Sequence, residues 1–437
     1  MRDPSPESSH ASAGQAHADA RLPLRYRFAG LLLAPAFIAH AVFRAARDGG
    51  FAYLRGRLGY MDYRSASQPV WIHCASVGEV ITAAPLLKAL ESNEVSPLVV
   101  TTSTPTGHVI ARKRLRPSVH VHYLPIDRPS AIRRFLRRLR PRAALILETE
   151  LWPHLFAELR RLRIPIALVN ARLTQRSLRA PRWWGPVARF CLECVTVVLA
   201  RSAEDASRFR ELGAPSPRIH VIGNLKLAAP SVETEAGPMD LKRPFVLVAS
   251  THDDEERQIA TAWDRLGLRD HLLVIAPRHP ERGGNIARTL VANGYDVARR
   301  SQGDCISATT EIYLADTMGE LPALMAASEL VIMGGSLVPH GGHNVLEAAR
   351  AERAVITGPH TDNFHDECAA LERAGALARG QDATDVVGIA RDLLSDPERR
   401  RAMGYRAGEL LEAAGTITDD YMASLRIHIP AMTAATD

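Results

Sequence analysis

The chain alternates short apolar runs with stretches of helical spacing, and this alternation constrains its fold more than any other feature. The first series of runs comprises Val70–Cys74, Leu98–Thr102, Val119–Leu124, Ala143–Leu147, Ile166–Val169 and Val195–Leu199. The second comprises Phe245–Ala249, Leu272–Ala276, Glu311–Leu314, Leu330–Met333 and Ala354–Ile356. Strands that are apolar throughout are typical of parallel sheets covered by helices on both faces. The sequence therefore predicts an α/β fold with two parallel sheets.

The two series are separated by Ala228–Pro244, which contains three prolines, a glycine and several charges. Such a stretch is typical of a linker. We predict five segments: a flexible tail over 1–20, a membrane-associated helical segment over 21–60, an N-terminal α/β domain over 61–230, a C-terminal α/β domain over 231–410 and a helical tail over 411–437.

Composition narrows the class of protein. Hydrophobic residues make up 46% of the 437 residues, which excludes a disordered chain and a multi-span membrane protein. The net charge of +6 favours anionic partners without choosing among them. Five cysteines are too few for a disulfide framework, which fits a reducing compartment. Cys191 and Cys194 have C-x-x-C spacing but no second pair, so we expect core thiols rather than zinc ligands.

An apolar run near the N-terminus, Phe28–Phe43, is flanked by arginines on both sides. It is shorter than the roughly 20 apolar residues that cross a bilayer, and it contains Pro35 and His40. We expect a helix that lies in a membrane surface with its arginines facing anionic headgroups. An ordinary buried or docking helix is the alternative.

A second basic segment spans Ile132–Arg142. Helical spacing places four apolar residues on one face and arginines around the other. The apolar residues are Ile132, Phe135, Leu136 and Leu139, and the arginines are Arg133, Arg134, Arg137 and Arg138. The arginines either form a solvated face or meet anionic lipid or the phosphates of a substrate.

Three common phosphate- or metal-binding motifs are missing from the sequence: G-x-G-x-x-G after the first strand, G-x-x-x-x-G-K-[ST], and D-x-D. Rossmann redox and P-loop chemistry therefore lack their signatures. In a doubly wound sheet, ligands gather beyond the carboxyl ends of the strands. Glu79 follows the first strand there, and Glu148 and Glu150 follow the fourth. Paired carboxylates suit a general base, although Glu79 alone could complement a helix dipole.

The second half of the chain has the features of a phosphate site. Arg278 and His279 follow one strand end, and a loop with two Gly-Gly pairs, 334–347, follows another. Glycines let backbone amides approach an anion, and a helix that begins near Asn344 would point its positive end at it. Glu347 could accept hydrogen bonds from a ribose diol. We interpret the acidic run 253–256 as caps of a helix. The residues thus predict a metal-independent glycosyltransferase of GT-B type.

Nine motifs, in order along the chain, resemble those of the 3-deoxy-D-manno-octulosonic acid (Kdo) transferases of lipopolysaccharide assembly. They are WIHCASVGEV (71–80), TTSTPTGH (101–108), ETELWP (148–153), NARL (170–173), GNLK (223–226), STHDDEE (250–256), APRHPER (276–282), DTMGEL (316–321) and GGSLVPHGGHNVLEAA (334–349). The resemblance covers about Leu24 to the end of the chain. Two positions depart from the family pattern: Val345 stands where a proline is expected, and Leu227-Ala228 where Phe-Asp is common.

The resemblance implies two Rossmann-like domains that face a central cleft, with the acceptor on the side of 61–230 and the nucleotide sugar on 231–410. It implies inverting transfer of Kdo from CMP-Kdo to a lipid A precursor, lipid IVA, without a metal or cofactor. Glu79 corresponds to the general base, and Glu148 and Lys226 to residues that stabilise the transition state. The residues that correspond to the CMP site are Pro277, Arg278, Met318, Gly319, Glu320, Asn344, Val345, Leu346 and Glu347.

The family resemblance also implies a place on the cytoplasmic side of the inner membrane, peripheral or anchored by the N-terminal segment, in contact with anionic lipids. Nucleic acid is not expected as a partner, because the basic helix lacks interleaved aromatic residues. Two alternatives stay open. One is a GT-B-fold nucleotide-sugar epimerase, which would use the paired carboxylates on the sugar. The other is a non-catalytic peripheral membrane protein that binds glycolipid through its arginines.

Overall fold

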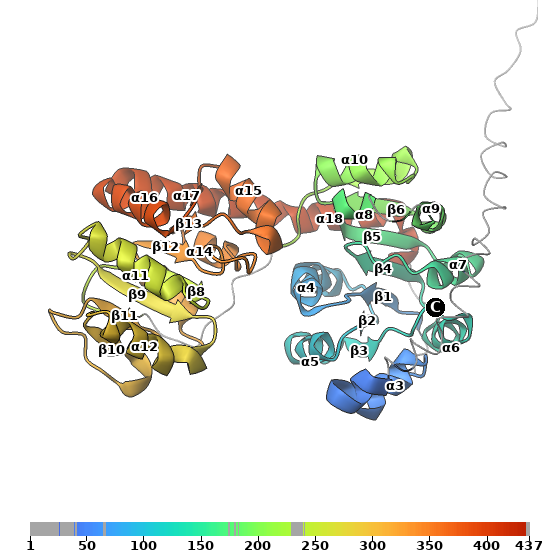
Figure 1. The fold of residues 1–437 in the computed structure, drawn as a ribbon. Helices are drawn as coiled ribbons and strands as arrows, with labels where there is room; N and C mark the ends of the chain where they lie inside the picture. Colours follow the sequence, from blue (N-terminus) through green and yellow to red (C-terminus); the bar gives the residue numbers. More distant parts are fainter. Residues whose placement is uncertain are drawn as a thin grey trace, which may run out of the picture. The chain divides into compact units, whose positions relative to one another are not determined.

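The structure is a computed structural model that describes residues 26, 39, 42–63, 67–173, 175–178, 181, 183–228, 239 and 241–433. The chain divides into two compact units, one made of Met1–Ala229 with Thr416–Asp437 and the other of Pro230–Gly415. Each unit contains a seven-stranded sheet (Figure 1). All strand pairs in both sheets are parallel. The prediction of two parallel-sheet α/β domains is confirmed.

The sheet of the N-terminal unit has the strand order β3-β2-β1-β4-β5-β6-β7. Its strands are β1 (Val70–His73), β2 (Leu98–Thr102), β3 (His120–Tyr123), β4 (Ala143–Leu147), β5 (Ile166–Ala171), β6 (Val197–Ala200) and β7 (Ile219–Val221). The helices between them are α4 (Val77–Ser92), α5 (Pro105–Arg114), α6 (Pro129–Leu139), α7 (Pro153–Arg161), α8 (Gln175–Leu178), α9 (Trp184–Cys194) and α10 (Ala203–Glu211). The order reverses between β1 and β4, the position where ligands of such sheets bind.

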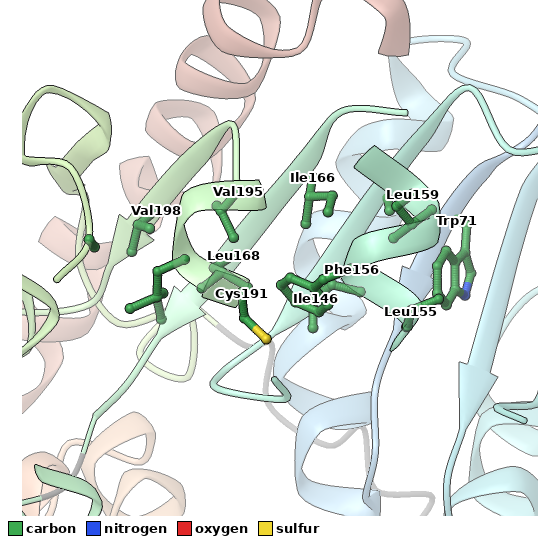
Figure 2. Packing of buried hydrophobic residues seen from close by; sticks show 14 of the residues in the cluster. Trp71, Ile146, Leu155, Phe156, Leu159, Ile166, Leu168, Cys191, Val195 and Val198 are labelled. Carbon is green, nitrogen blue, oxygen red and sulfur yellow. The ribbon is translucent and has the colours of Figure 1, made fainter. Parts of the chain in front are cut away.

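Successive residues of each strand pack on opposite faces of this sheet. Trp71 and Ile146 face the helices α6, α7 and α9, whereas Ile72 and Leu145 face α4 and α5 (Figure 1). Because both faces are covered, the central strands are apolar along their whole length. Cys191 lies within the first of these cores (Figure 2), which confirms the expectation of a core thiol.

The last described α-helix belongs to the N-terminal unit. Helix α18 (Ile417–His428) packs against α4, and its Tyr421 and Leu425 are fully buried in the second core. The Tyr421 hydroxyl donates a hydrogen bond of 2.9 Å to the carbonyl of Gly223. The segment that we predicted as a helical tail, 411–437, therefore contributes a structural helix to the N-terminal core.

The sheet of the C-terminal unit has the order β10-β11-β9-β8-β12-β13-β14. Its strands are β8 (Phe245–Thr251), β9 (Leu272–Pro277), β10 (Val297–Arg299), β11 (Ile312–Leu314), β12 (Leu330–Met333), β13 (Ala354–Thr357) and β14 (Leu377–Arg379). Its helices are α11 (Glu255–Arg265), α12 (Gly283–Ala292), α13 (Leu321–Ala327), α14 (Leu346–Arg350), α15 (His365–Arg373), α16 (Ala383–Ser395) and α17 (Pro397–Ala413). The helices α11, α12 and α16 cover one face, while α14 and α17 pack beside β13.

The tail over 1–20 and most of the apolar run 28–43 lie outside the described residues, as does most of the predicted linker. The chain directly after this run is helical: a π-helical turn, η1 (Ala45–Gly49), leads into α3 (Gly50–Arg57). Tyr53 of α3 is buried, and its ring meets that of Tyr123 at 5.0 Å between centroids. Within the described ranges, no helix is both long enough and apolar enough to cross a bilayer.

The position of α18 leads to a stability prediction. Tyr421→Ala removes a fully buried ring and its hydrogen bond, so we expect the free energy of unfolding of the N-terminal unit to fall by about 4 kcal/mol. Urea denaturation followed by circular dichroism measures this change. Ile427→Ala on the same helix is the control, because Ile427 is 73% exposed. Equal effects of the two substitutions would show that α18 is not part of the core.

Candidate active site

The candidate residues of the N-terminal unit lie at the carboxyl edge of its sheet. Glu79 follows β1, Glu148 and Glu150 follow β4, and Lys226 follows β7. Because every strand of a parallel sheet ends at the same edge, residues far apart in the sequence are placed on one side of the unit. This edge also contains Asn170, the last residue but one of β5.

Glu79 lies in the first turn of α4 and is buried, with 8% of its surface exposed. Its carboxyl group accepts hydrogen bonds from the Ala75 amide, at 2.7 Å, and from the Ser76 hydroxyl, at 3.1 Å. The Ser76 Oγ in turn accepts the Glu79 N–H, so the two residues cap the helix reciprocally. Burial, reinforced by the charges of Glu148 and Glu150, raises the pKa of Glu79 to about 8.

The two carboxylates after β4 occupy a constrained turn. Glu148 has a φ of 55°, in the left-handed region that residues other than glycine seldom adopt, and its N–H donates to the Val169 carbonyl at 2.9 Å. Burial raises the pKa of Glu150, and the charge of Glu148 raises it further. Two neighbouring carboxylates in a partly buried position repel each other, which costs free energy. This cost favours contact with a ligand over a purely structural role for the pair.

Lys226 sits in a loop that other parts of the N-terminal unit hold in place. Asn170 Oδ1 accepts the Leu225 N–H at 3.0 Å, and Asn224 Oδ1 accepts the Lys226 N–H at 3.1 Å. The first residue of the GNLK motif, Gly223, is the one whose carbonyl bonds to Tyr421 of α18. The NARL and GNLK motifs therefore meet in space. No local pattern in the sequence marks Asn170 as the anchor of this loop.

In the C-terminal unit the structure reveals a role for Glu255 that the sequence did not indicate. Glu255 is fully buried, and its carboxylate accepts four backbone N–H groups. The donors are His252 at 2.8 Å, Gly335 at 2.7 Å, Ser336 at 3.1 Å and Leu337 at 2.9 Å. Our expectation that the amides of the first Gly-Gly pair bind a ligand anion is therefore corrected. The Gly335 amide already binds an anion of the protein itself.

The second half of the glycine loop is built differently. Gly341 and Gly342 have φ values of 85° and 76°, and the Gly342 N–H donates to the Gly335 carbonyl at 2.8 Å. Asn344 donates to Glu347 Oε1 at 3.0 Å and accepts the Leu346 N–H at 3.2 Å. Helix α14 has five residues, and it starts two residues after the expected position. So short a helix adds little dipole to a phosphate site.

A histidine cluster lies beside this loop. His252 and His343 share a hydrogen bond of 2.8 Å between their Nε2 atoms, and the ring of His340 stacks on His252 at 4.0 Å between centroids. Burial, reinforced by electrostatic repulsion from His252 and Arg278, lowers the pKa of His343 to about 4. His343 is therefore neutral at pH 7. Arg278, which directly follows β9, contributes a permanent positive charge to this region.

The remaining candidates for the CMP site have distinct surroundings. Met318 is 78% exposed, and Gly319 has a φ of 88°. The Glu320 carboxylate is paired with the Arg300 guanidinium at 2.6 Å and also accepts the Thr317 hydroxyl. Pro277 is buried at the end of β9, and Val345 and Leu346 are buried at the start of α14. No cluster of three or more His, Cys, Asp or Glu residues in the described part of the chain could hold a metal ion.

Comparison with known proteins identifies the family. The chain matches the model of the 3-deoxy-D-manno-octulosonic-acid transferase (kdotransferase) family over residues 52–229. It is 37% identical over 385 residues to a 3-deoxy-D-manno-octulosonic acid transferase of Bordetella pertussis, covering 83% of this chain and 89% of the relative. The chain belongs to the Kdo transferase family. Members of this family are glycosyltransferases.

Solved structures show which fold this Kdo transferase has. A putative UDP-N-acetylglucosamine 2-epimerase from Listeria monocytogenes is 17% identical with a TM-score of 0.59, over 84% of this chain and 97% of that one. A glycosyltransferase from Rickettsia africae is 11% identical with a TM-score of 0.57, over 85% of this chain and all of that one. At such identities the likeness concerns the fold alone. It confirms the GT-B type that the sequence predicts.

The position of Glu255 in this Kdo transferase leads to a second stability prediction. Glu255→Ala removes the acceptor of four N–H groups, so we expect the free energy of unfolding of the C-terminal unit to fall by at least about 3 kcal/mol. Thermal and urea denaturation measure this change. Glu281→Ala, at an exposed carboxylate, is the control and is expected to change it by less than about 0.5 kcal/mol. A loss below about 1 kcal/mol for Glu255→Ala would contradict this role.

Proposed function

We propose that the chain transfers Kdo from CMP-Kdo to a lipid A precursor, lipid IVA, in the assembly of the lipopolysaccharide core. The observation that carries this proposal is the buried carboxyl group of Glu79, whose raised pKa suits a proton acceptor near neutral pH. Membership of the Kdo transferase family supports the donor and the type of acceptor. The proposal places the enzyme on the cytoplasmic side of the inner membrane, peripheral or anchored by its N-terminal segment.

In the proposed reaction the acceptor hydroxyl oxygen bonds to the anomeric carbon of Kdo. The bond between this carbon and the phosphate oxygen of CMP breaks, and CMP leaves with the electron pair. Glu79, as the carboxylate, takes the hydroxyl proton. Attack on the face opposite the leaving group inverts the anomeric centre. A positioned general base of this kind typically accelerates a reaction by about 10²–10⁴-fold.

CMP leaves with a single phosphate, whose growing charge requires positive or N–H groups. We propose that Arg278 supplies the positive charge and that the neutral imidazole of His343 donates a hydrogen bond. Glu148 and Lys226, at the carboxyl edge of the N-terminal sheet, are proposed to stabilise the transition state. Lys226 suits this role because Asn224 accepts its N–H and Asn170 accepts the N–H of Leu225, which holds the loop in place before substrate binds.

One experiment tests the function. The purified protein is incubated with CMP-Kdo, lipid IVA or both, and the glycolipid is analysed by mass spectrometry while CMP release is followed. Kdo addition with CMP release only when both substrates are present is the expected result. Turnover of a nucleotide sugar without an acceptor would instead identify an epimerase. Glycolipid binding without CMP release would identify a non-catalytic protein.

Glu79→Gln tests the general base. Glutamine keeps an acceptor for the Ala75 N–H but cannot take a proton, so we expect kcat to fall by about 10²–10⁴-fold with little change in CMP affinity. Radiolabelled transfer assays and calorimetric CMP titration measure the two quantities. Glu91→Gln, in the last turn of the same helix, is the control and is expected to retain activity. A fully active Glu79→Gln enzyme would refute the mechanism.

The raised pKa of Glu79 predicts the pH dependence of the reaction. A base works in its deprotonated form, so kcat/KM is expected to rise about tenfold per pH unit below pH 8 and to level off above it. An unperturbed glutamate would place the plateau above about pH 5. In Glu79→Gln this rise should disappear. A wild-type profile that is flat between pH 6 and pH 8 would show that the base does not have the raised pKa that we assign to Glu79.

Arg278→Gln tests the proposed phosphate contact. Loss of a charge-assisted hydrogen bond costs about 1.5–3 kcal/mol, so CMP affinity is expected to fall by about 10–150-fold. Isothermal titration with CMP measures it. Arg288→Gln, at an exposed position of α12 in the same unit, should leave the affinity unchanged. If both variants bind CMP equally well, Arg278 does not contact the phosphate.

A further inference from the structure

The N-terminal unit has an open groove of about 900 Å³ beside the C-terminal ends of α6 and α7, which lie next to each other (Figure 1). Its lining includes Arg142 and Pro165, which directly precede β4 and β5, and Gln68, which lies two residues before β1. This end of the groove is therefore at the amino edge of the sheet, and from there the groove extends along α6 as far as Ser130. Glu79 and Glu148 are at the carboxyl edge, and neither of them lines the groove.

Arginines dominate this groove. Its lining contains seven of them and one carboxylate: Arg133, Arg134, Arg137, Arg140, Arg142, Arg161, Arg163 and Glu158. Three of the arginines have a structural partner. Arg161 pairs with Glu158 at 2.7 Å, Arg142 donates to the carbonyls of Ser96 and Met432, and Arg134 lies over the Tyr60 ring at 4.1 Å.

Four arginines remain: Arg133, Arg137, Arg140 and Arg163. All four are exposed, and no described carboxylate lies within ion-pair distance of them. Arg133 and Arg137 each use Nε to bond the main-chain carbonyl one turn earlier, at 3.1 and 3.3 Å. Their terminal Nη groups are left for another acceptor.

Helix dipoles do not account for this charge. Arginines in a last turn complement the partial negative charge of a helix C-terminus, which amounts to about half an elementary charge per helix. The two helix ends at the groove thus offset about one positive charge, whereas four of its arginines have no carboxylate partner among the described residues. Because the net charge of all 437 residues is only +6, this groove holds an unusual share of the positive charge of the protein.

We propose that the groove binds phosphate groups of anionic lipid headgroups and thereby docks the N-terminal unit on a membrane surface. The planar guanidinium fork matches phosphate oxygens in pairs. The apolar side chains of Leu136, Leu162 and Ile164 line the same groove, and Leu162 is 41% exposed, which suits the amphipathic boundary of a lipid surface. The lining contains none of the proposed catalytic residues, Glu79, Glu148 and Lys226, and this site goes beyond the proposed transfer reaction.

Vesicle co-sedimentation of the full chain tests the proposal, with vesicles of phosphatidylcholine alone or mixed with phosphatidylglycerol. The double variant Arg133→Gln/Arg137→Gln removes two charges from the groove. Each arginine near an anionic surface contributes about five-fold to the partition coefficient. Loss of two arginines is therefore expected to lower partition onto the mixed vesicles about 25-fold. The matched control is Arg373→Gln/Arg401→Gln. Both control arginines are exposed and bond the carbonyl one turn earlier through Nε, as Arg133 and Arg137 do.

The control is expected to bind vesicles within two-fold of the wild type. Equal losses in both double variants, or no loss in either, would overturn the proposal. Titration with inorganic phosphate distinguishes a soluble ligand: phosphate binding that depends on Arg133 and Arg137, with unchanged vesicle binding, would overturn the assignment to lipid. Circular dichroism and thermal melting confirm that both double variants are folded.

Transfer assays with detergent-dispersed acceptor separate this proposal from the proposed function. An unchanged KM for the acceptor in Arg133→Gln/Arg137→Gln is expected. A raised KM would assign the groove to the phosphates of the acceptor and overturn the docking role. Inactive wild-type protein would refute the transfer reaction, while the vesicle result would stand by itself.

Discussion

Parallel pairing of apolar strands is the constraint on which both units depend. A parallel strand must be followed by a crossover that returns the chain to the starting edge, and the helices of these crossovers cover both faces of the sheet. Every strand then ends at one edge, so the polar loops of the sheet gather there. The residues after β1, β4 and β7 lie at the same edge of the sheet for this reason, although almost 150 positions separate Glu79 from Lys226 in the sequence.

Two buried carboxylates in such loops differ in role: one stabilises the fold, and the other is proposed to take part in the reaction. Glu255 accepts four backbone N–H groups, which leaves it little capacity to contact a ligand and makes it part of the frame of the glycine loop. Glu79 accepts from one amide and one hydroxyl within its own turn, and burial with two neighbouring carboxylates raises its pKa. Both residues follow a strand directly or nearly so. The number of donors that surround each carboxylate distinguishes them.

The sequence predicted the interior of both sheets and missed part of their edges. All eleven predicted strands exist, whereas β7, β10 and β14 were not predicted. These three are edge strands of three residues, and each contains a polar side chain: His220, Arg299 or Arg379. An edge strand is only partly covered, so it needs no continuous apolar run.

The candidate site was also predictable only in part: several of its residues could be named from the sequence, but the contacts between them could not. Residue type and position after a strand indicated Glu79, Glu148 and Arg278, and the family resemblance added the others. The bond from Glu255 to Gly335 joins positions 80 residues apart, and Glu320 is paired with Arg300. Contacts of this kind depend on packing in three dimensions and leave no periodicity in the sequence.

The placement of α18 has a consequence for how the protein is made. The C-terminal unit is one continuous piece of chain inserted between two pieces of the N-terminal unit. During synthesis the whole of the inserted unit leaves the ribosome before Tyr421 and Leu425 do. Until α18 arrives, the part of the core beside α4 that Tyr421 and Leu425 fill therefore stays uncovered. The unit that begins the chain is the one that finishes folding last, which reverses the usual N-to-C order.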